Sequence, residues 1–214
     1  MLKLVIFDLD QTLVNTMHRF YILFNDALSK FGCKSVTWEA FIEKYKEDNL
    51  STYICTENRI FWDYFLSHFN DRECTEDSLI HGTSSVLSEL KKNGLIIVIV
   101  TGRMVPASSV WEELEKFDIA KYVDYVYTRN DNYCDGFRRT ELILKAMKKF
   151  GACPEETVLV ADYWPDMQSG REASVFTVGV LTGHVNKRQL LENGANRIIP
   201  SVAELMPVLT HFFH

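Results

Sequence analysis

Short apolar runs alternate with helical patterns along most of the chain, and this alternation constrains the fold more than any other feature. A first run, LVIF, lies at 4–7, and later runs lie at 96–100, 122–127, 157–161 and 175–180. Helical patterns occupy 84–93, 108–117, 139–150, 166–173 and 186–193. Strands that alternate with helices form a parallel sheet with helices on both faces. The sequence therefore predicts an α/β fold.

Residues 16–80 interrupt this alternation. They contain one glycine, Gly32, and no proline, and apolar side chains such as Phe20, Phe24 and Leu28 recur at helical spacing. We expect Gly32 to end the first helix of this segment. An insertion of roughly 65 residues is too long for an ordinary loop. The sequence thus predicts two domains, a core formed by 1–15 and 81–214 and a helical domain formed by 16–80.

Polar side chains follow three of the predicted strands. Asp8 comes after LVIF, Thr101 after IIVIV and Asp162 after TVLVA. Ligands bind at the carboxyl ends of the strands in open α/β sheets, so these side chains are expected to meet at one edge. Each could also be an ordinary turn residue. The nearby Asp10 and Asp166 make a shared site the better interpretation.

Composition narrows the functional class. The net charge is −6, so nucleic acid, which binds basic surfaces, is not an expected partner. No apolar run approaches the ~20 residues of a membrane span, and no secretory signal is recognisable. A cytoplasmic protein without a membrane partner is expected. Its five cysteines are odd in number and scattered, without a CxxC pair, which favours reduced thiols over disulfides or thiolate metal sites.

Three motifs, in order, resemble those of the haloacid dehalogenase superfamily on its aspartyl-phosphatase branch. FDLDQTLVNT (7–16) resembles the first motif, DxDx[TV], VIVTGR (98–103) the second, and VADYWPDM (160–167) the fourth. The helical insertion resembles the small cap of that family, and 181–205 resembles the carboxyl-terminal region of phosphoglycolate-phosphatase-like members. The resemblance implies a Rossmann-like core, and a Mg²⁺-dependent phosphatase that acts on a small phosphorylated metabolite.

The resemblance also implies roles for individual residues. Asp8 would attack phosphorus and form an aspartyl-phosphate, and Asp10 would act as the general acid and base. Thr101 and the backbone N–H of Gly102 would hold phosphate oxygens. Thr12 is expected to anchor the loop through a hydrogen bond rather than to react.

A metal site follows from the same carboxylates. Asp8, Asp10, Asp162 and Asp166 would repel one another unless a cation lay among them, and oxygen ligands beside a phosphate favour Mg²⁺. By resemblance, Asp8, the Asp10 carbonyl and Asp162 would bind the ion. Asp166 would be an outer or occasional ligand, or would cap the helix that follows.

The third motif departs from the family pattern. The lysine usual there is missing, and Arg139 is the candidate replacement, with Arg138 beside it as a further candidate for binding phosphate. Arg139 could instead be a simple first-turn helix residue, and Lys145 lies too far into the helix. Arg103 is expected to be a solvated surface residue, with contact to a substrate anion as the alternative.

Two other functions remain open at this point. One is a phosphomutase of the β-phosphoglucomutase kind, which passes the phosphoryl group to a sugar instead of to water. The other is a non-catalytic relative that binds a phosphate ligand, as the missing lysine would allow. The sequence leaves open whether the chain is a monomer or a homodimer.

Overall fold

The computed structural model describes residues 1–71, 74–131, 138–183 and 185–212. Six parallel strands form its main sheet in the order β5-β4-β1-β6-β7-β8. These strands are β1 (Leu4–Phe7), β4 (Ile96–Val100), β5 (Tyr125–Tyr127), β6 (Thr157–Ala161), β7 (Phe176–Val180) and β8 (Arg197–Ile199). The predicted α/β class with a Rossmann-like parallel sheet is confirmed.

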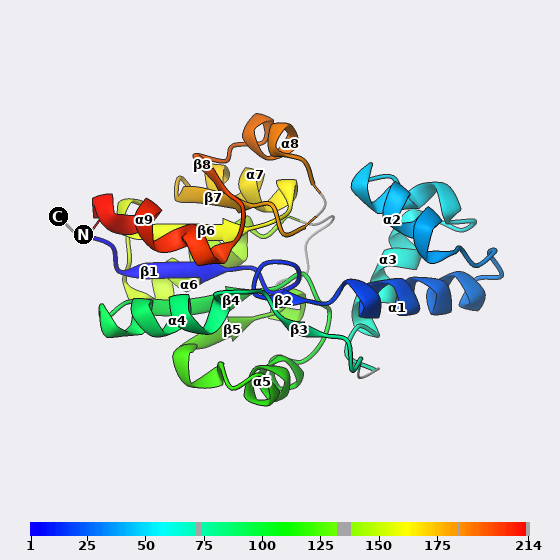
Figure 1. The fold of residues 1–214 in the computed structure, drawn as a ribbon, viewed down its shortest axis with the longest axis horizontal. Coiled ribbons are helices and arrows are strands. Elements are labelled where there is room, and N and C mark those ends of the chain that lie inside the picture. The colour runs from blue at the N-terminus through cyan, green and yellow to red at the C-terminus, as the bar shows by residue number, and fades with distance from the viewer. Residues whose placement is uncertain (72–73, 132–137, 184, 213–214) are drawn as a thin grey trace.

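Helices cover both faces of this sheet (Figure 1). The helices of this part are α4 (Thr83–Lys92), α5 (Ala107–Lys116), α6 (Thr140–Phe150), α7 (Trp164–Glu172), α8 (Lys187–Glu192) and α9 (Leu205–Leu209). Side chains alternate along a strand, so Val5 and Phe7 pack with α4, α5 and α9, whereas Leu4 and Ile6 pack with α6. Burial on both faces explains why the strands are almost wholly apolar.

Strand β1 lies at the centre of the sheet, and its neighbours bring the three sequence motifs together. Phe7 pairs with Ile99 of β4 on one side and with Val160 of β6 on the other. The three strands therefore end at nearly the same level. The residues that follow them, widely separated in sequence, meet at one edge of the sheet.

The inserted segment forms α1 (Met17–Lys30), α2 (Trp38–Lys46), a 3-10 turn (Leu50–Tyr53) and α3 (Asn58–Ser67). Its helices pack around their own aromatic core, in which Phe24, Phe41 and Phe61 are fully buried. Gly32, at φ +73°, follows the end of α1 as expected. Figure 1 shows α1, α2 and α3 beyond the carboxyl ends of the sheet strands, opposite the two chain termini. We call this segment the cap, with 16–80 as its proposed bounds.

A short antiparallel ribbon joins the cap to the core. Strand β2 (Val14–Asn15) leads into the cap and β3 (Ser78–Leu79) leads out of it, with Val14 opposite Leu79. The sequence analysis missed these strands and β8, because none of them lies in an apolar run long enough to show a period. The ribbon holds the entry and exit of the cap side by side.

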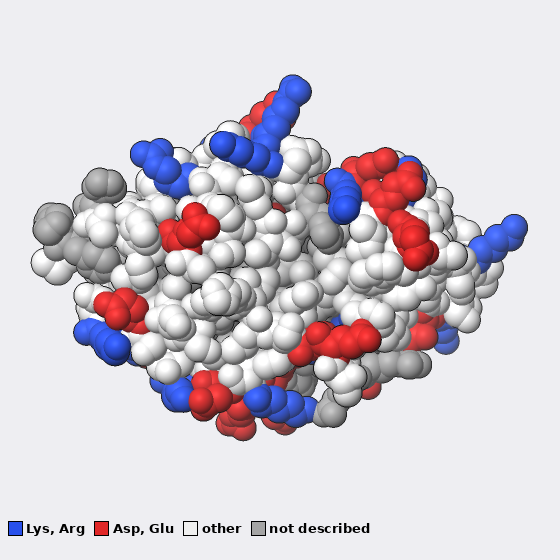
Figure 2. Space-filling model, in the orientation of Figure 1, with Lys and Arg blue, Asp and Glu red and all other residues white. Residues whose placement is uncertain are grey.

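On the face drawn in Figure 2, Lys and Arg side chains lie at scattered points among Asp and Glu and form no broad basic patch among the coloured residues. Within the described ranges, no helix combines the length and the apolar character needed to cross a membrane.

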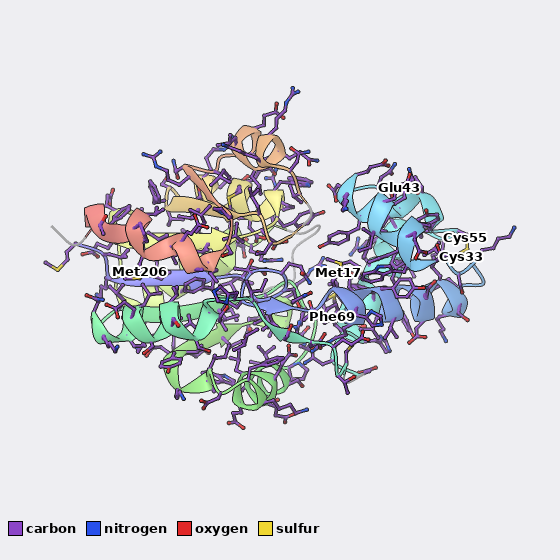
Figure 3. The ribbon with its side chains drawn as sticks, viewed as in Figure 1. Met17, Cys33, Glu43, Cys55, Phe69 and Met206 are labelled. Atoms are coloured by element: carbon purple, nitrogen blue, oxygen red, sulfur yellow. A yellow bond between two sulfur atoms is a disulfide. The ribbon has the colours of Figure 1, made fainter. Side chains whose placement is uncertain are left out.

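The cysteine prediction is wrong for one pair. Cys33 and Cys55 form a disulfide in the cap, whereas Cys74 and Cys153 are free, and Cys134 lies outside the described residues. Figure 3 shows the pair at the end of the cap that points away from the sheet. The turn after α1 and the turn before α3 bring the two residues together, a proximity that a separation of 22 residues does not reveal.

Reduction of this disulfide should destabilise the cap. A disulfide that closes a loop of this length stabilises the folded state by about 3 kcal/mol, because it constrains the unfolded chain. We expect thermal unfolding, followed by tryptophan fluorescence, to shift to lower temperature after reduction or in Cys33→Ser/Cys55→Ser. Cys153→Ser, at an exposed free cysteine, should leave the midpoint unchanged. Equal midpoints with and without reductant would contradict the disulfide's stabilising role.

Candidate active site

The ends of the three central strands carry buried polar side chains. Asp8 is 4% exposed, Asp162 5% and Thr101 fully buried. The backbone N–H of Asp8 donates to the carbonyl of Val160, and that of Thr101 donates to the carbonyl of Tyr127, both at 3.0 Å. The strand pairing thus continues into the site and fixes where these residues stand.

Thr12 lies between the first and the fourth motif. Its Oγ1 is 3.3 Å from Asp8 Oδ2 and 3.2 Å from Asp162 Oδ1. The two carboxylates therefore share one hydroxyl as a partner, although they are 154 positions apart in the chain. This contact is of the anchoring kind expected for Thr12.

Arg139 is the basic partner of Asp8. Its Nη1 is 2.6 Å from Asp8 Oδ1 and 2.8 Å from Asp166 Oδ1. The residue is the N-cap of α6, and its backbone N–H donates to Ser169 Oγ at 2.9 Å. The N-cap residue of α6 thus places a cationic side chain in the site, where it pairs with two carboxylates.

The neighbouring basic residues lie elsewhere. Arg138 pairs with Glu172 at 2.6 Å on the exposed surface, so the structure does not bring it to Asp8. Lys145 donates to the carbonyl of Asp131 and is exposed. Gly102 packs against the Arg139 guanidinium: a Cβ at position 102 would come within 2.7 Å of Arg139 Nη2. Glycine at this position therefore makes room for the arginine.

The clustered carboxylates resist ionisation. Burial raises the pKa of Asp166 to about 7; Arg139 opposes this rise and the negative charge of Asp8 adds to it. Burial, reinforced by Asp8 and Asp166, raises the pKa of Asp162 well above its usual range. Burial also raises the pKa of Asp8, against the opposing charge of Arg139. One arginine does not balance three buried carboxylates.

This imbalance fits a divalent cation. Asp166 Oδ2 is buried without a hydrogen-bond partner among the described residues, and oxygen donors of this kind suit Mg²⁺. Across 1–71, 74–131, 138–183 and 185–212, no three His, Cys, Asp or Glu side chains form a metal site by themselves. An ion here would therefore also need the Asp10 carbonyl, water or substrate oxygens, as Mg²⁺ commonly does.

Arg103 is buried, and the expectation of a solvated surface residue is wrong. It is 1% exposed, and it binds the Asp10 carboxylate through Nε at 2.9 Å and Nη2 at 2.7 Å. Thr16 Oγ1 donates to Asp10 as well, at 2.7 Å. Burial opposes the ionisation of Asp10, but the charge and hydrogen bonds of Arg103 outweigh it, so the pKa of Asp10 is lowered.

The Arg103 guanidinium continues into a buried charge network that the sequence analysis missed. Its Nη1 is 2.7 Å from Glu113 of α5, and Glu113 also binds Arg19 of the cap helix α1 at 2.9 Å. Arg19 in turn binds Asp77, just before β3. Phe69, labelled at the cap–core junction in Figure 3, lies under both guanidinium groups, 4.6 and 5.5 Å from its ring centre. The sequence does contain one signal of this network, because Glu113 is a charged residue on the apolar face of the amphipathic helix α5.

Two further backbone positions shape the site. Gln11 has φ +60°, a left-handed conformation that favours glycine. Gly183 lies against Asp162, and a Cβ there would overlap the Asp162 carboxylate. The segment at 182–183 is thus part of the site, and Thr182 Oγ1 donates to the Gln11 carbonyl at 2.5 Å.

A cavity of about 320 Å³ opens over these residues, between the core and the cap. Asp8, Asp10, Gly102, Arg139 and Asp162 lie along it. Thr101 is buried beneath, and its Oγ1 accepts from the backbone N–H of Arg103 at 3.3 Å. Each predicted site residue except Arg138 therefore belongs to one contiguous group around Asp8.

Comparisons with known proteins show which family the chain belongs to. A family model described as "Haloacid dehalogenase-like hydrolase" matches residues 5–180. Pyrophosphatase PpaX of Bacillus mycoides is 27% identical over 213 residues, 96% of this chain and 96% of that protein. A phosphoglycolate phosphatase of Aquifex aeolicus is 21% identical over 197 residues, 86% of this chain and 87% of that protein. A predicted phosphatase from Clostridium acetobutylicum shares the fold, with a TM-score of 0.82, 23% identity and 99% of both chains covered.

The resemblance seen in the sequence is thus confirmed. The family model spans all three recognised motifs together with the cap, and curated relatives align over nearly the whole chain. This protein belongs to the haloacid dehalogenase-like hydrolases.

Proposed function

We propose that this hydrolase is a Mg²⁺-dependent phosphatase that cleaves a small phosphate monoester through an aspartyl-phosphate on Asp8. The observation that carries the proposal is the position of Asp8. It is a buried carboxylate on a cavity wall, ion-paired to Arg139 and beside Asp162 and Asp166. Relatives with phosphatase and pyrophosphatase names support the same reaction class.

Asp8 is suited to act as a nucleophile. Burial removes water from the carboxylate and raises its pKa, while the contact with Arg139 Nη1 favours the ionised form. One carboxylate oxygen would attack phosphorus as the bond to the ester oxygen breaks. The same arginine, on the side of Gly102, would then face the phosphoryl oxygens as charge builds on them.

Asp10 would move the protons. In the first half-reaction its carboxyl gives a proton to the departing alkoxide. In the second, its carboxylate takes a proton from the water that attacks the aspartyl-phosphate and releases phosphate from Asp8. Arg103 and Thr16 hold Asp10 ionised in this structure, which suits the second half. Proton donation requires these contacts to loosen when substrate is bound.

The residues that would hold Mg²⁺ are Asp8, Asp162 and the Asp10 carbonyl, with Asp166 close by. When bound, the ion would offset the negative charge that clusters here and polarise the phosphoryl group. Thr12 would keep Asp8 and Asp162 facing the same point, because its hydroxyl contacts both.

The two alternatives are less well supported. A non-catalytic relative was suggested by the missing lysine, but Arg139 supplies a cation in contact with Asp8. A sugar phosphomutase needs polar groups to orient a second sugar hydroxyl, whereas the described cap side of the cavity is mostly apolar and aromatic. Release of free phosphate, rather than isomerisation, is the expected reaction.

Replacement of Asp8 tests the nucleophile. In a phosphate-release screen of small monoesters with Mg²⁺, Asp8→Asn should lose on the order of 10⁴-fold or more in kcat. Asp118→Asn, at an exposed aspartate paired with Lys121, should match the parent. A parent without any phosphate release across the panel, or an Asp8→Asn variant that keeps its activity, would rule the proposal out.

Replacement of Arg139 tests the third motif. Arg139→Lys keeps the charge and should stay within about tenfold of the parent, whereas Arg139→Met should lose ~10²–10³ in kcat. Arg138→Met is the matched control, because its salt bridge is to Glu172 on the surface. If the Arg138 variant lost activity and the Arg139 variant did not, the assignment of the basic residue would be reversed.

The raised pKa values predict how stability depends on pH and metal. Asp8, Asp162 and Asp166 bind protons more tightly folded than unfolded, so metal-free protein should gain stability as pH falls from 8 towards the usual carboxyl pKa of about 4. In the presence of a chelator, we expect a higher melting temperature at pH 5.5 than at pH 8. Addition of Mg²⁺ at pH 8 should raise the melting temperature again. Asp166→Asn should flatten the pH dependence. A metal-free protein that melts higher at pH 8 would contradict this charge balance.

A further inference from the structure

The cavity wall opposite Asp8 is built from aromatic and aliphatic side chains of the cap. Phe20 of α1 and Trp62 and Phe65 of α3 form its centre, with ring centres 4.6–6.2 Å apart. The described cap residues that complete this wall are Tyr45, Asp48, Leu50, Ser51, Leu66 and Phe69. A wall of this kind favours contact with an apolar group rather than with an ion.

The cations on the cavity wall are already engaged. Among the lining residues in the described ranges, only Arg103 and Arg139 carry positive charge. Arg103 pairs with Asp10 and Glu113, and Arg139 with Asp8 and Asp166. No further described cation lines the cavity to receive a second anionic group of the substrate.

Asp48 adds negative charge to the same wall. It follows α2, and it joins cap to core by accepting from Tyr163 Oη at 3.0 Å and from Trp164 Nε1 at 2.7 Å. Asp48 is a member of the cavity lining that the cap contributes. A carboxylate or a second phosphate on the leaving group would meet this charge without a cation to offset it.

We infer that the substrate is the phosphate ester of an alcohol that bears an aromatic or bulky apolar group and no second anionic group. The inference rests on the proposed phosphatase function and specifies its leaving group. The phosphate would lie at Asp8 and Arg139, and the apolar group against Phe20, Trp62 and Phe65. A cavity of about 320 Å³ is at the small end of the range for ligand sites, which suits one or two rings rather than a long chain.

The inference separates this chain from what the names of its relatives suggest. Phosphoglycolate carries a carboxylate beside the scissile phosphate, and pyrophosphate carries a second phosphoryl group. Both place an anion where the described wall is apolar or acidic. Each should therefore be a poor substrate for this enzyme, although relatives are named for them.

The test compares esters whose leaving alkoxides have similar basicity. Phosphate release is measured with Mg²⁺ for benzyl phosphate, ethyl phosphate and 2-phosphoglycolate, with pyrophosphate as a separate arm. Benzyl phosphate should have a kcat/KM at least about 30-fold above ethyl phosphate and 2-phosphoglycolate, since filling an apolar pocket discriminates on the order of 10–200-fold. Higher kcat/KM for 2-phosphoglycolate or pyrophosphate than for benzyl phosphate would overturn the inference and leave the phosphatase proposal standing. Lack of release from every compound would instead refute the proposed function.

Two variants and one control variant locate the effect in the cavity wall. Ser51 is exposed and lines the cavity, and the adjacent Thr52 is exposed but does not line it. Ser51→Arg should raise the ratio of kcat/KM for 2-phosphoglycolate over benzyl phosphate at least about tenfold, while Thr52→Arg, with the same added charge, should leave the ratio unchanged. Trp62→Leu should raise KM for benzyl phosphate more than for ethyl phosphate. Equal ratios in the two arginine variants, or equal KM changes for both esters in Trp62→Leu, would overturn the inference.

Discussion

The contact of Arg139 with Asp8 and Asp166 is the interaction on which the rest of the site depends. Carboxylates at the ends of apolar strands lose their water, and a buried charge is tolerated only with a partner. Arg139 reaches both from the N-cap position of α6, and Gly102 leaves the space for it. The compensation is incomplete, as the raised pKa values of the carboxylates show. The remaining negative charge is the reason that we propose a bound cation at this site.

A second buried charge group joins chemistry to domain arrangement. Arg103 forms ion pairs with Asp10 and with Glu113, and Glu113 also pairs with Arg19 at the base of the cap. The residue proposed to carry protons is therefore linked through three ion pairs to the helix that begins the cap. A movement of α1 that displaces Arg19 would change the ion pairs of Glu113 and Arg103, and through them the contacts of Asp10. We therefore expect proton transfer and cap position to be coupled.

The sequence was sufficient for the elements that repeat a pattern and insufficient for contacts between distant elements. Strand ends at Asp8, Thr101 and Asp162 followed from apolar runs and from the rule that parallel strands end together. The burial of Arg103 could not be predicted in this way, because it depends on Glu113 and on a cap placed over the core. The disulfide in the cap escaped prediction for the same reason, since its partners meet only after the helices pack. Long-range pairing leaves no periodic trace in one chain.

The central claim is that Asp8 accepts the phosphoryl group, and one measurement tests it directly. The enzyme is quenched in acid during turnover of a good ester substrate, reduced with borohydride, digested and analysed by peptide mass spectrometry. An aspartyl-phosphate is reduced to homoserine, whereas a free carboxylate is not. The account predicts homoserine at position 8 in a fraction that vanishes without substrate. Steady phosphate release with only intact aspartate at position 8, or with the modification at another residue, would contradict it.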